Sequence, residues 1–165
     1  MPSPSELRVH AERFDVLGDG GERSDSTEPL FAYGTLQLEP VLRVLIGRIP
    51  QKLPAEAVGW RVVRLPGKPY PGLVRDAGRT AVGQLITGLT PQEWMLLDRF
   101  EDGIYRLDQV TTVDGRQAWA YVWPDAGEDA DWTLASFSDG SDQLREYVER
   151  CTRWLERDRS RGAGR

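Results

Sequence analysis

The sequence predicts an α+β protein, built as a small mixed β-barrel or a strongly curled sheet with flanking helices. Five or six stretches have the apolar, β-branched composition typical of strands, whereas few stretches show helical spacing. The strands and helices do not alternate regularly, as they would in a parallel α/β fold. A length of 165 residues allows one domain with a substantial core.

The first half of the chain contains most of the predicted strands. The first strand runs from Leu30 to Thr35, and a helix follows it near Glu39, because Pro40 suits a first helical turn. The next strand spans 57–65 and is bounded by prolines at 54 and 66. A turn follows, and residues 70–74 lead into a further strand at 81–89.

The second half contains clearer local signals. Thr90, Pro91 and Glu93 form a capping box that predicts a helix start, and this helix should stop at Gly103. Residues 105–113 and 116–123 are predicted strands joined by a tight hairpin turn at Asp114-Gly115. A final helix shows an apolar stripe made of Leu144, Tyr147, Val148, Cys151, Trp154 and Leu155.

The two ends are predicted to lie outside the core. Residues 1–28 are rich in Ser, Gly, Asp, Glu and Arg, and are predicted to be a flexible extension. The domain is placed at 29–157, and 158–165 is predicted to be a polar tail.

Composition argues against several classes of partner. The net charge of −5 and the pI near 5.0 disfavour nucleic-acid binding. No apolar run approaches the length that crosses a bilayer, and the N-terminus lacks a signal-peptide pattern. The prediction is therefore a cytoplasmic protein without membrane or nucleic-acid partners, and its oligomeric state stays open.

The chain contains a single histidine, His10, and a single cysteine, Cys151. This composition argues against a Ser/His/Asp or Cys/His apparatus and against a zinc site with imidazole ligands. Carboxylates, tyrosines, amines or backbone groups should therefore supply any acid–base chemistry, and no metal or organic cofactor is expected.

The segment Tyr33-Gly34-Thr35-Leu36 is the first candidate site. An apolar strand breaks there at a glycine, which leaves no Cβ to crowd a bound group. Amide N–H groups after such a turn can point together at one anion or carbonyl oxygen. The alternative is an ordinary strand followed by a glycine turn.

Glu101 is the second candidate. It falls at the negative end of a predicted helix, beside Phe100 and between Asp98 and Asp102. Each of these influences would raise the pKa of the carboxyl group, which suits a general acid or base working near neutral pH. The alternative is a solvated glutamate at a helix end.

Four segments in this order resemble the γ-glutamylcyclotransferase-like family, in particular its small avirulence-induced-gene-like branch, and also the butirosin-pathway γ-glutamyl cyclotransferases. They are Phe31-Ala32-Tyr33-Gly34-Thr35-Leu36, Tyr70-Pro71-Gly72-Leu73, Gly83-Gln84-Leu85, and Leu97-Asp98-Arg99-Phe100-Glu101 followed by Tyr105.

The resemblance implies a mixed β-barrel with a cavity at one end that holds a γ-glutamyl group. Glu101 would be the catalytic acid–base, and the backbone amides of Tyr33, Gly34, Thr35 and Leu36 would bind the substrate. The product would be 5-oxoproline, with no cofactor. Leu36 stands where the glutathione-processing branch usually has asparagine, which makes glutathione a weaker substrate candidate.

Tyr105 and Tyr70 are secondary candidates for substrate binding. Tyr105 could hydrogen-bond within the cavity or pack in the core, and Tyr70 could line the rim or belong to a turn. Two other functions stay open: hydrolysis or acyl transfer on another amide in the same pocket, and a non-catalytic ligand-binding domain.

Overall fold

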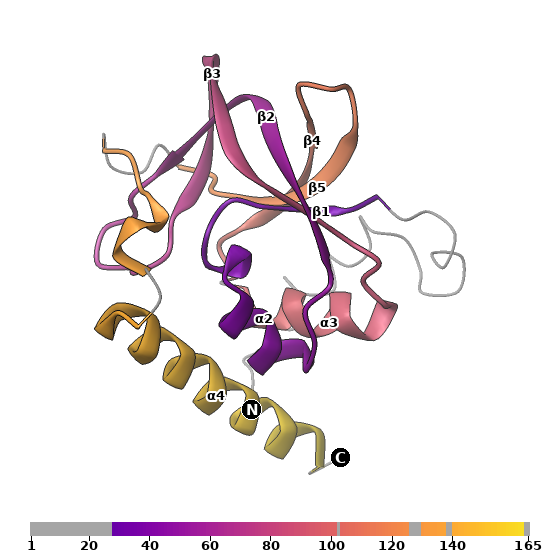
Figure 1. Ribbon diagram of the computed structural model, residues 1–165, viewed down its shortest axis with the longest axis vertical. Helices are drawn as coiled ribbons and strands as arrows, with labels where there is room; N and C mark the ends of the chain where they lie inside the picture. Colours follow the sequence, from indigo (N-terminus) through magenta and orange to yellow (C-terminus); the bar gives the residue numbers. More distant parts are fainter. Residues whose placement is uncertain (1–27, 102, 126–129, 138–139, 164–165) are drawn as a thin grey trace.

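The computed structural model describes residues 28–101, 103–125, 130–137 and 140–163. Within these residues, five strands form one sheet in the order β2-β3-β1-β5-β4 (Figure 1). Only the pairing of β1 with β5 is parallel, so the sheet is mixed. The strands are β1 (Leu30–Ala32), β2 (Gln51–Val63), β3 (Gly72–Thr87), β4 (Arg106–Thr111) and β5 (Gln117–Val122).

The sheet curls but does not close into a barrel, so the open form of the predicted architecture is the one observed. The edge strands β2 and β4 meet at a single isolated bridge between Ala57 and Thr112. Beside it, the Val113 N–H donates to the Glu56 carbonyl at 2.9 Å. A curled sheet brings its two edges together in this way without forming a continuous ladder.

Two strand boundaries differ from the sequence prediction. β2 passes through Pro54, which was expected to lie outside the strand; this is possible because β2 is an edge strand and has one free side. β3 begins at Gly72, before the predicted start at 81, and runs without a break to Thr87. Its register against β2 shifts between Val58 and Trp60, where Gly59 adopts a φ of +84°.

The first strand is shorter than predicted. β1 ends at Ala32, and the chain then turns into the 3-10 segment η1 (Thr35–Gln37). The hydrogen bonds from the Gln37 N–H to the Gly34 carbonyl and from the Leu38 N–H to the Thr35 carbonyl, both 3.1 Å, hold this turn. The strand therefore ends three residues earlier than predicted, and the loop begins at Tyr33.

Three helices of the described chain lie together on one side of the sheet (Figure 1). They are α2 (Glu39–Ile46), α3 (Pro91–Phe100) and α4 (Asp142–Ala163); a second 3-10 segment, η2, spans Leu134–Phe137. The predicted capping box of α3 is confirmed, with Thr90 as its N-cap. None of the helices in the described residues is long and apolar enough to cross a membrane.

Both predicted helix ends differ from the structure. α3 ends at Phe100, with Glu101 as its C-cap, rather than continuing to Gly103. α4 continues through most of the predicted polar tail and reaches Ala163. Within that stretch Asp158 accepts two hydrogen bonds from Arg99, each 3.0 Å, which join the end of α4 to α3. The predicted N-terminal extension, apart from Glu28, lies outside the described residues.

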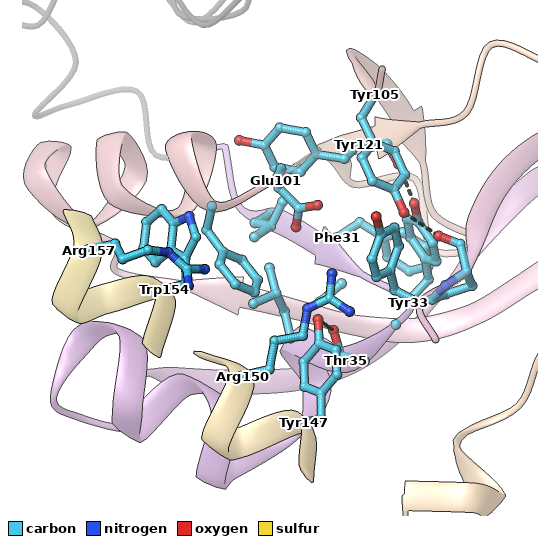
Figure 2. A pocket seen from close by; sticks show the side chains of 17 residues that line it. Phe31, Tyr33, Thr35, Glu101, Tyr105, Tyr121, Tyr147, Arg150, Trp154 and Arg157 are labelled. Atoms are coloured by element: carbon cyan, nitrogen blue, oxygen red, sulfur yellow. Dashed lines mark hydrogen bonds between the residues drawn. The ribbon is translucent and has the colours of Figure 1, made fainter. Parts of the chain in front are cut away.

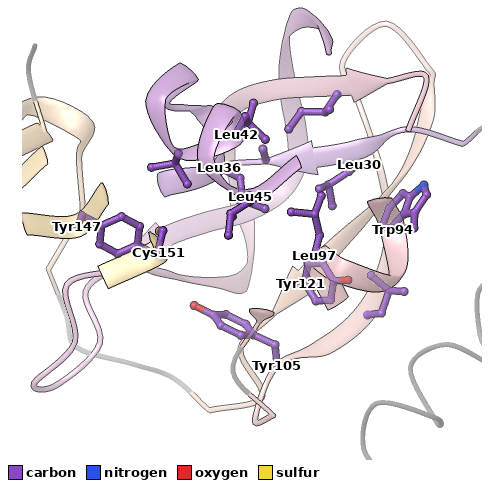
Figure 3. Packing of buried hydrophobic residues seen from close by; sticks show 14 of the residues in the cluster. Leu30, Leu36, Leu42, Leu45, Trp94, Leu97, Tyr105, Tyr121, Tyr147 and Cys151 are labelled. Atoms are coloured by element: carbon purple, nitrogen blue, oxygen red, sulfur yellow. The ribbon is translucent and has the colours of Figure 1, made fainter. Parts of the chain in front are cut away.

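The core has two parts, one on each face of the sheet. Leu30 and Ala32 of β1 pack against the helices, with Leu42, Leu45 and other residues drawn in Figure 3. Phe31 alternates to the opposite face and packs inside the curl of the sheet. β1 is therefore buried on both faces, and the loop that follows it starts from a fixed position.

Candidate active site

A cavity of about 260 Å³ opens beside the end of β1 (Figure 2). Its volume is close to the small end of the range for small-molecule sites, about 300–1,000 Å³. Every site residue predicted from the sequence lines this one cavity. The predicted residues are Tyr33, Gly34, Thr35, Leu36, Tyr70, Glu101 and Tyr105.

The cavity has two walls that differ in the elements that form them. The inner wall consists of Tyr33, Gly34, Thr35, Leu36, Glu101 and Tyr105. The α4 wall consists of Tyr147, Arg150, Trp154 and Arg157.

Gly34 lies against Pro71. A Cβ atom built on Gly34 would be 2.9 Å from Cγ of Pro71 and 3.0 Å from its Cδ. The φ of Gly34 is −122°, a value that any residue adopts, so space rather than backbone strain requires glycine. Pro71 is itself held, because its carbonyl accepts a hydrogen bond from the Tyr105 hydroxyl.

Glu101 lies where α3 ends. Its backbone N–H still donates to the Leu97 carbonyl at 3.0 Å, while its ψ of 143° takes the chain out of the helix. The side chain is half-buried, and its carboxylate points into the cavity (Figure 2). The change of direction at Glu101 thus brings a carboxylate to the inner wall.

Buried tyrosines surround this carboxylate. Burial raises the pKa of Tyr33, Tyr105 and Tyr147, and in each case the negative charge of Glu101 raises it further. All three phenols therefore stay neutral at physiological pH and act as hydrogen-bonding groups. The Tyr33 hydroxyl donates to the Tyr121 carbonyl, which ties the start of the loop to β5.

The two secondary candidates have distinct positions. Tyr105 both packs in the core and lines the cavity, and its ring meets Trp123 edge-on at 5.2 Å between centroids. Tyr70 is half-buried at the cavity, and its hydroxyl accepts a hydrogen bond from Lys68 Nζ at 3.1 Å.

Asp98 is fully buried one turn before Glu101. The Tyr121 hydroxyl donates to its Oδ1 at 2.8 Å, which ties α3 to β5. Asp98 thus has a structural contact in the core, and the expected effect of its charge on Glu101 stays a prediction. Asp102 lies outside the described residues. Within the described part of the chain, no three His, Cys, Asp or Glu side chains gather into a metal-binding group.

The sequence analysis missed the α4 wall. Tyr147, Cys151 and Trp154 were assigned to the packing face of a helix, and Cys151 is indeed fully buried. Arg150 and Arg157, however, also line the cavity. The spacing of positions 147, 150, 154 and 157 could have indicated this wall, because these positions fall on one helical face. Tyr121 of β5 is buried and also lines the cavity.

Comparison with known proteins identifies the family and supports the fold. A family model described as "Gamma-glutamyl cyclotransferase, AIG2-like" matches residues 30–139. That range includes β1, the loop after it and Glu101, whereas α4 lies beyond it. The chain belongs to this family.

Several plant proteins are similar in sequence. AIG2-like protein C of Arabidopsis thaliana is 35% identical over 99 residues, which cover 57% of this chain and 58% of that protein. AIG2-like protein B of the same plant is 26% identical over 147 residues, which cover 82% and 83%. The match to AIG2-like protein D covers 66% of that relative, so this chain spans about two thirds or less of relatives C and D.

Solved structures share the fold. A solution structure from Arabidopsis thaliana is 24% identical with a TM-score of 0.59, covering 81% of this chain and 84% of that one. A structure titled "Gamma-glutamyl cyclotransferase" is 13% identical with a TM-score of 0.51, covering 75% and 99%.

Proposed function

We propose that this protein is a γ-glutamylcyclotransferase-like enzyme that releases 5-oxoproline from a γ-glutamyl amine or γ-glutamylated metabolite. The observation that carries the proposal is the position of Glu101: its carboxylate points into the cavity opposite the loop at the end of β1 (Figure 2). Membership of the "Gamma-glutamyl cyclotransferase, AIG2-like" family supports the same reaction class.

The substrate contains its own nucleophile. The α-amine of a γ-glutamyl amide can reach the γ-carbonyl carbon and close a five-membered ring. Because both groups belong to one molecule, the attack has a high effective concentration once the chain is held in the folded conformer. The protein's task is to bind that conformer and to transfer protons from the attacking nitrogen to the departing one.

Glu101 serves as the general acid–base in this proposal. Its carboxylate takes a proton from the α-ammonium, and the freed amine nitrogen bonds to the γ-carbonyl carbon. Glu101 delivers this proton to the departing nitrogen as the bond from that nitrogen to the carbon breaks. It then takes the second proton from the ring nitrogen and passes it to the released amine. The products are 5-oxoproline and the amine as its ammonium ion, and no water is consumed.

The rest of the inner wall binds and orients the substrate. Backbone amides of the Tyr33–Leu36 loop hold the γ-glutamyl group and stabilise negative charge on the carbonyl oxygen. The neutral hydroxyls of Tyr33 and Tyr105 line the same cavity as Glu101 and complete the inner wall around the substrate.

Product analysis tests the proposal. The protein is incubated with a panel of γ-glutamyl amines and γ-glutamyl peptides, and 5-oxoproline and glutamate are both quantified. Release of 5-oxoproline is expected. Release of glutamate would indicate a hydrolase in the same pocket, and binding without turnover would indicate a non-catalytic domain.

A further inference from the structure

The α4 wall presents a single helical face to the cavity. Its four residues are spaced by three, four and three positions, which places them in line along one side of a helix. Near the start of this line the Tyr147 hydroxyl accepts a hydrogen bond from Thr35 Oγ1 at 2.9 Å. α4 is thereby attached to the loop of the inner wall at one end, and the remaining residues extend away from the loop.

The two arginines are the second and the fourth residue of that line. The Arg150 guanidinium lies 5.6 Å from the centroid of the Tyr70 ring, and Figure 2 shows it pointing into the same space as the Glu101 carboxylate. Arg157 follows two helical turns later, about 15 Å from Tyr147 along the axis at 1.5 Å per residue. Trp154 lies between them and packs edge-on against Phe100 at 5.1 Å between centroids.

The charge of the cavity is opposite to that of the whole chain. Two arginines and one glutamate line it, and the lining tyrosines are neutral, so the lining carries a net charge of about +1. The chain as a whole carries −5. Among the described residues, neither the Arg150 nor the Arg157 guanidinium makes an ion pair. Both arginine side chains are exposed and line the cavity.

The charge of the substrate then distinguishes between leaving groups. A γ-glutamyl derivative of a neutral amine is a zwitterion without net charge, and it offers no second anion. A derivative whose amine half bears a carboxylate or a phosphate has a net negative charge. The planar fork of a guanidinium binds either anion in a bidentate manner.

We propose that the α4 wall makes this protein selective for γ-glutamyl compounds whose departing amine carries an anionic group. This inference rests on the proposed function, because it takes the γ-glutamyl half to lie on the inner wall. The amine half then extends along α4, where Trp154 contacts its apolar part and Arg150 and Arg157 bind the anion. Family membership does not supply this assignment, since α4 lies outside the matched residues 30–139.

Three substrates that differ in one group test the selectivity. They are γ-glutamyl-ethylamine, which has no anion on the amine half, γ-glutamyl-alanine, which adds a carboxylate, and the γ-glutamyl derivative of phosphoethanolamine, which adds a phosphate. We expect kcat/KM for at least one anionic substrate to exceed that of the ethylamide by about tenfold or more, the range of a charge-assisted hydrogen bond. The better of the two anionic substrates identifies the anion.

The arginine variants show which residues are responsible. Arg157→Gln and Arg150→Gln should each lower the ratio of kcat/KM between the preferred anionic substrate and the ethylamide by about tenfold. Arg157→Lys should restore part of this ratio, because it restores the charge without the fork. Arg153→Gln is the matched control: Arg153 is exposed on the same helix and does not line the cavity, so its removal should leave the ratio unchanged.

The possible outcomes separate this inference from the proposed function. Equal release of 5-oxoproline from all three compounds would overturn the selectivity and leave the cyclotransferase intact. An equal loss on all three substrates in the arginine variants would also overturn it, since the arginines would then bind the glutamyl half. If no compound yields 5-oxoproline, the proposed function fails. Calorimetric binding of the same compounds then decides the selectivity, and equal affinities would overturn it.

Discussion

The inner wall and the α4 wall of the cavity differ in burial and in charge. Tyr33, Thr35, Leu36 and Tyr105 of the inner wall are buried, whereas Arg150 and Arg157 of the α4 wall are exposed. The inner wall contributes one carboxylate among neutral phenols, and the α4 wall contributes two positive charges. The difference suggests a division of work, with proton transfer on the buried side and recognition of the variable half of the substrate on the exposed side.

The strongest test of this division is Glu101→Gln. The substitution keeps the size of the side chain and removes its ability to accept a proton. We expect turnover to fall by about 10²–10⁴-fold while the fold is retained. The measurement is the rate of 5-oxoproline release, with circular dichroism as a check on the fold.

Glu146→Gln on the exposed face of α4 is the matched control, and it should keep the wild-type rate. A Glu101→Gln protein with near-normal turnover on a confirmed substrate would remove Glu101 from the mechanism.

The next largest effect is expected from Gly34→Val. Its side chain would overlap Pro71, which the Tyr105 hydroxyl holds in place. The loop would have to move, so binding of a γ-glutamyl ligand should be lost, with a stability cost of about 1–3 kcal/mol. Gly78→Val controls for the added side chain, because a Cβ at Gly78 meets nothing within 4 Å. Calorimetry and denaturant unfolding measure both effects, and unchanged affinity in Gly34→Val would exclude the loop from the site.

A smaller effect is expected on the stability of the fold at alkaline pH. Burial raises the pKa of Cys151 to about 12 and also raises the pKa of Tyr33, Tyr105 and Tyr147. Because the folded form keeps protons that the unfolded form loses, this stability is fully present below about pH 9 and declines as the pH rises toward 12. The urea midpoint should therefore fall between pH 9 and 12.

Cys151→Ala should make that decline shallower, because one of the titrating groups has been removed. A midpoint that stays constant over this range would show that these groups do not change their pKa on folding.

The smallest expected effect is that of chelation. The proposed mechanism uses Glu101 as a base, and a bound cation would lower the pKa of its carboxyl group and hinder that role. Dialysis against EDTA should leave the rate unchanged. A loss of activity that added Mg²⁺ or Mn²⁺ restores would favour a metal-assisted hydrolase over the cyclotransferase.

The sequence predicted best those features that depend on neighbouring residues. The capping box of α3 needs only Thr90, Pro91 and Glu93, and all three take their expected places. The hairpin turn near Gly115 is confirmed in the same way, with a φ of +86°. Pro54 was misleading because its tolerance depends on β2 being an edge strand, which is a property of the whole sheet.

In the candidate site, too, the features that depend on the packing of distant elements could not be predicted from the sequence. Seven residues from three separate segments were predicted to meet, and they line one cavity. The arginines of α4 were missed because an apolar stripe shows which helical face is buried. It does not show whether the polar residues next to that stripe face solvent or a cavity. Only the packing of α4 against the inner wall, with Tyr147 at Thr35, brings Arg150 to the cavity.

The position of β1 in the sheet has a consequence for folding. This three-residue strand pairs with β3 through Leu30 and Ile86, and with β5 through Leu30 and Trp119. Both pairings join residues far apart in the sequence, and such contacts form slowly because long loops must first close. We therefore expect β1, and with it the loop that begins at Tyr33, to be placed late in folding. Ligand binding would then report that the whole sheet has been assembled.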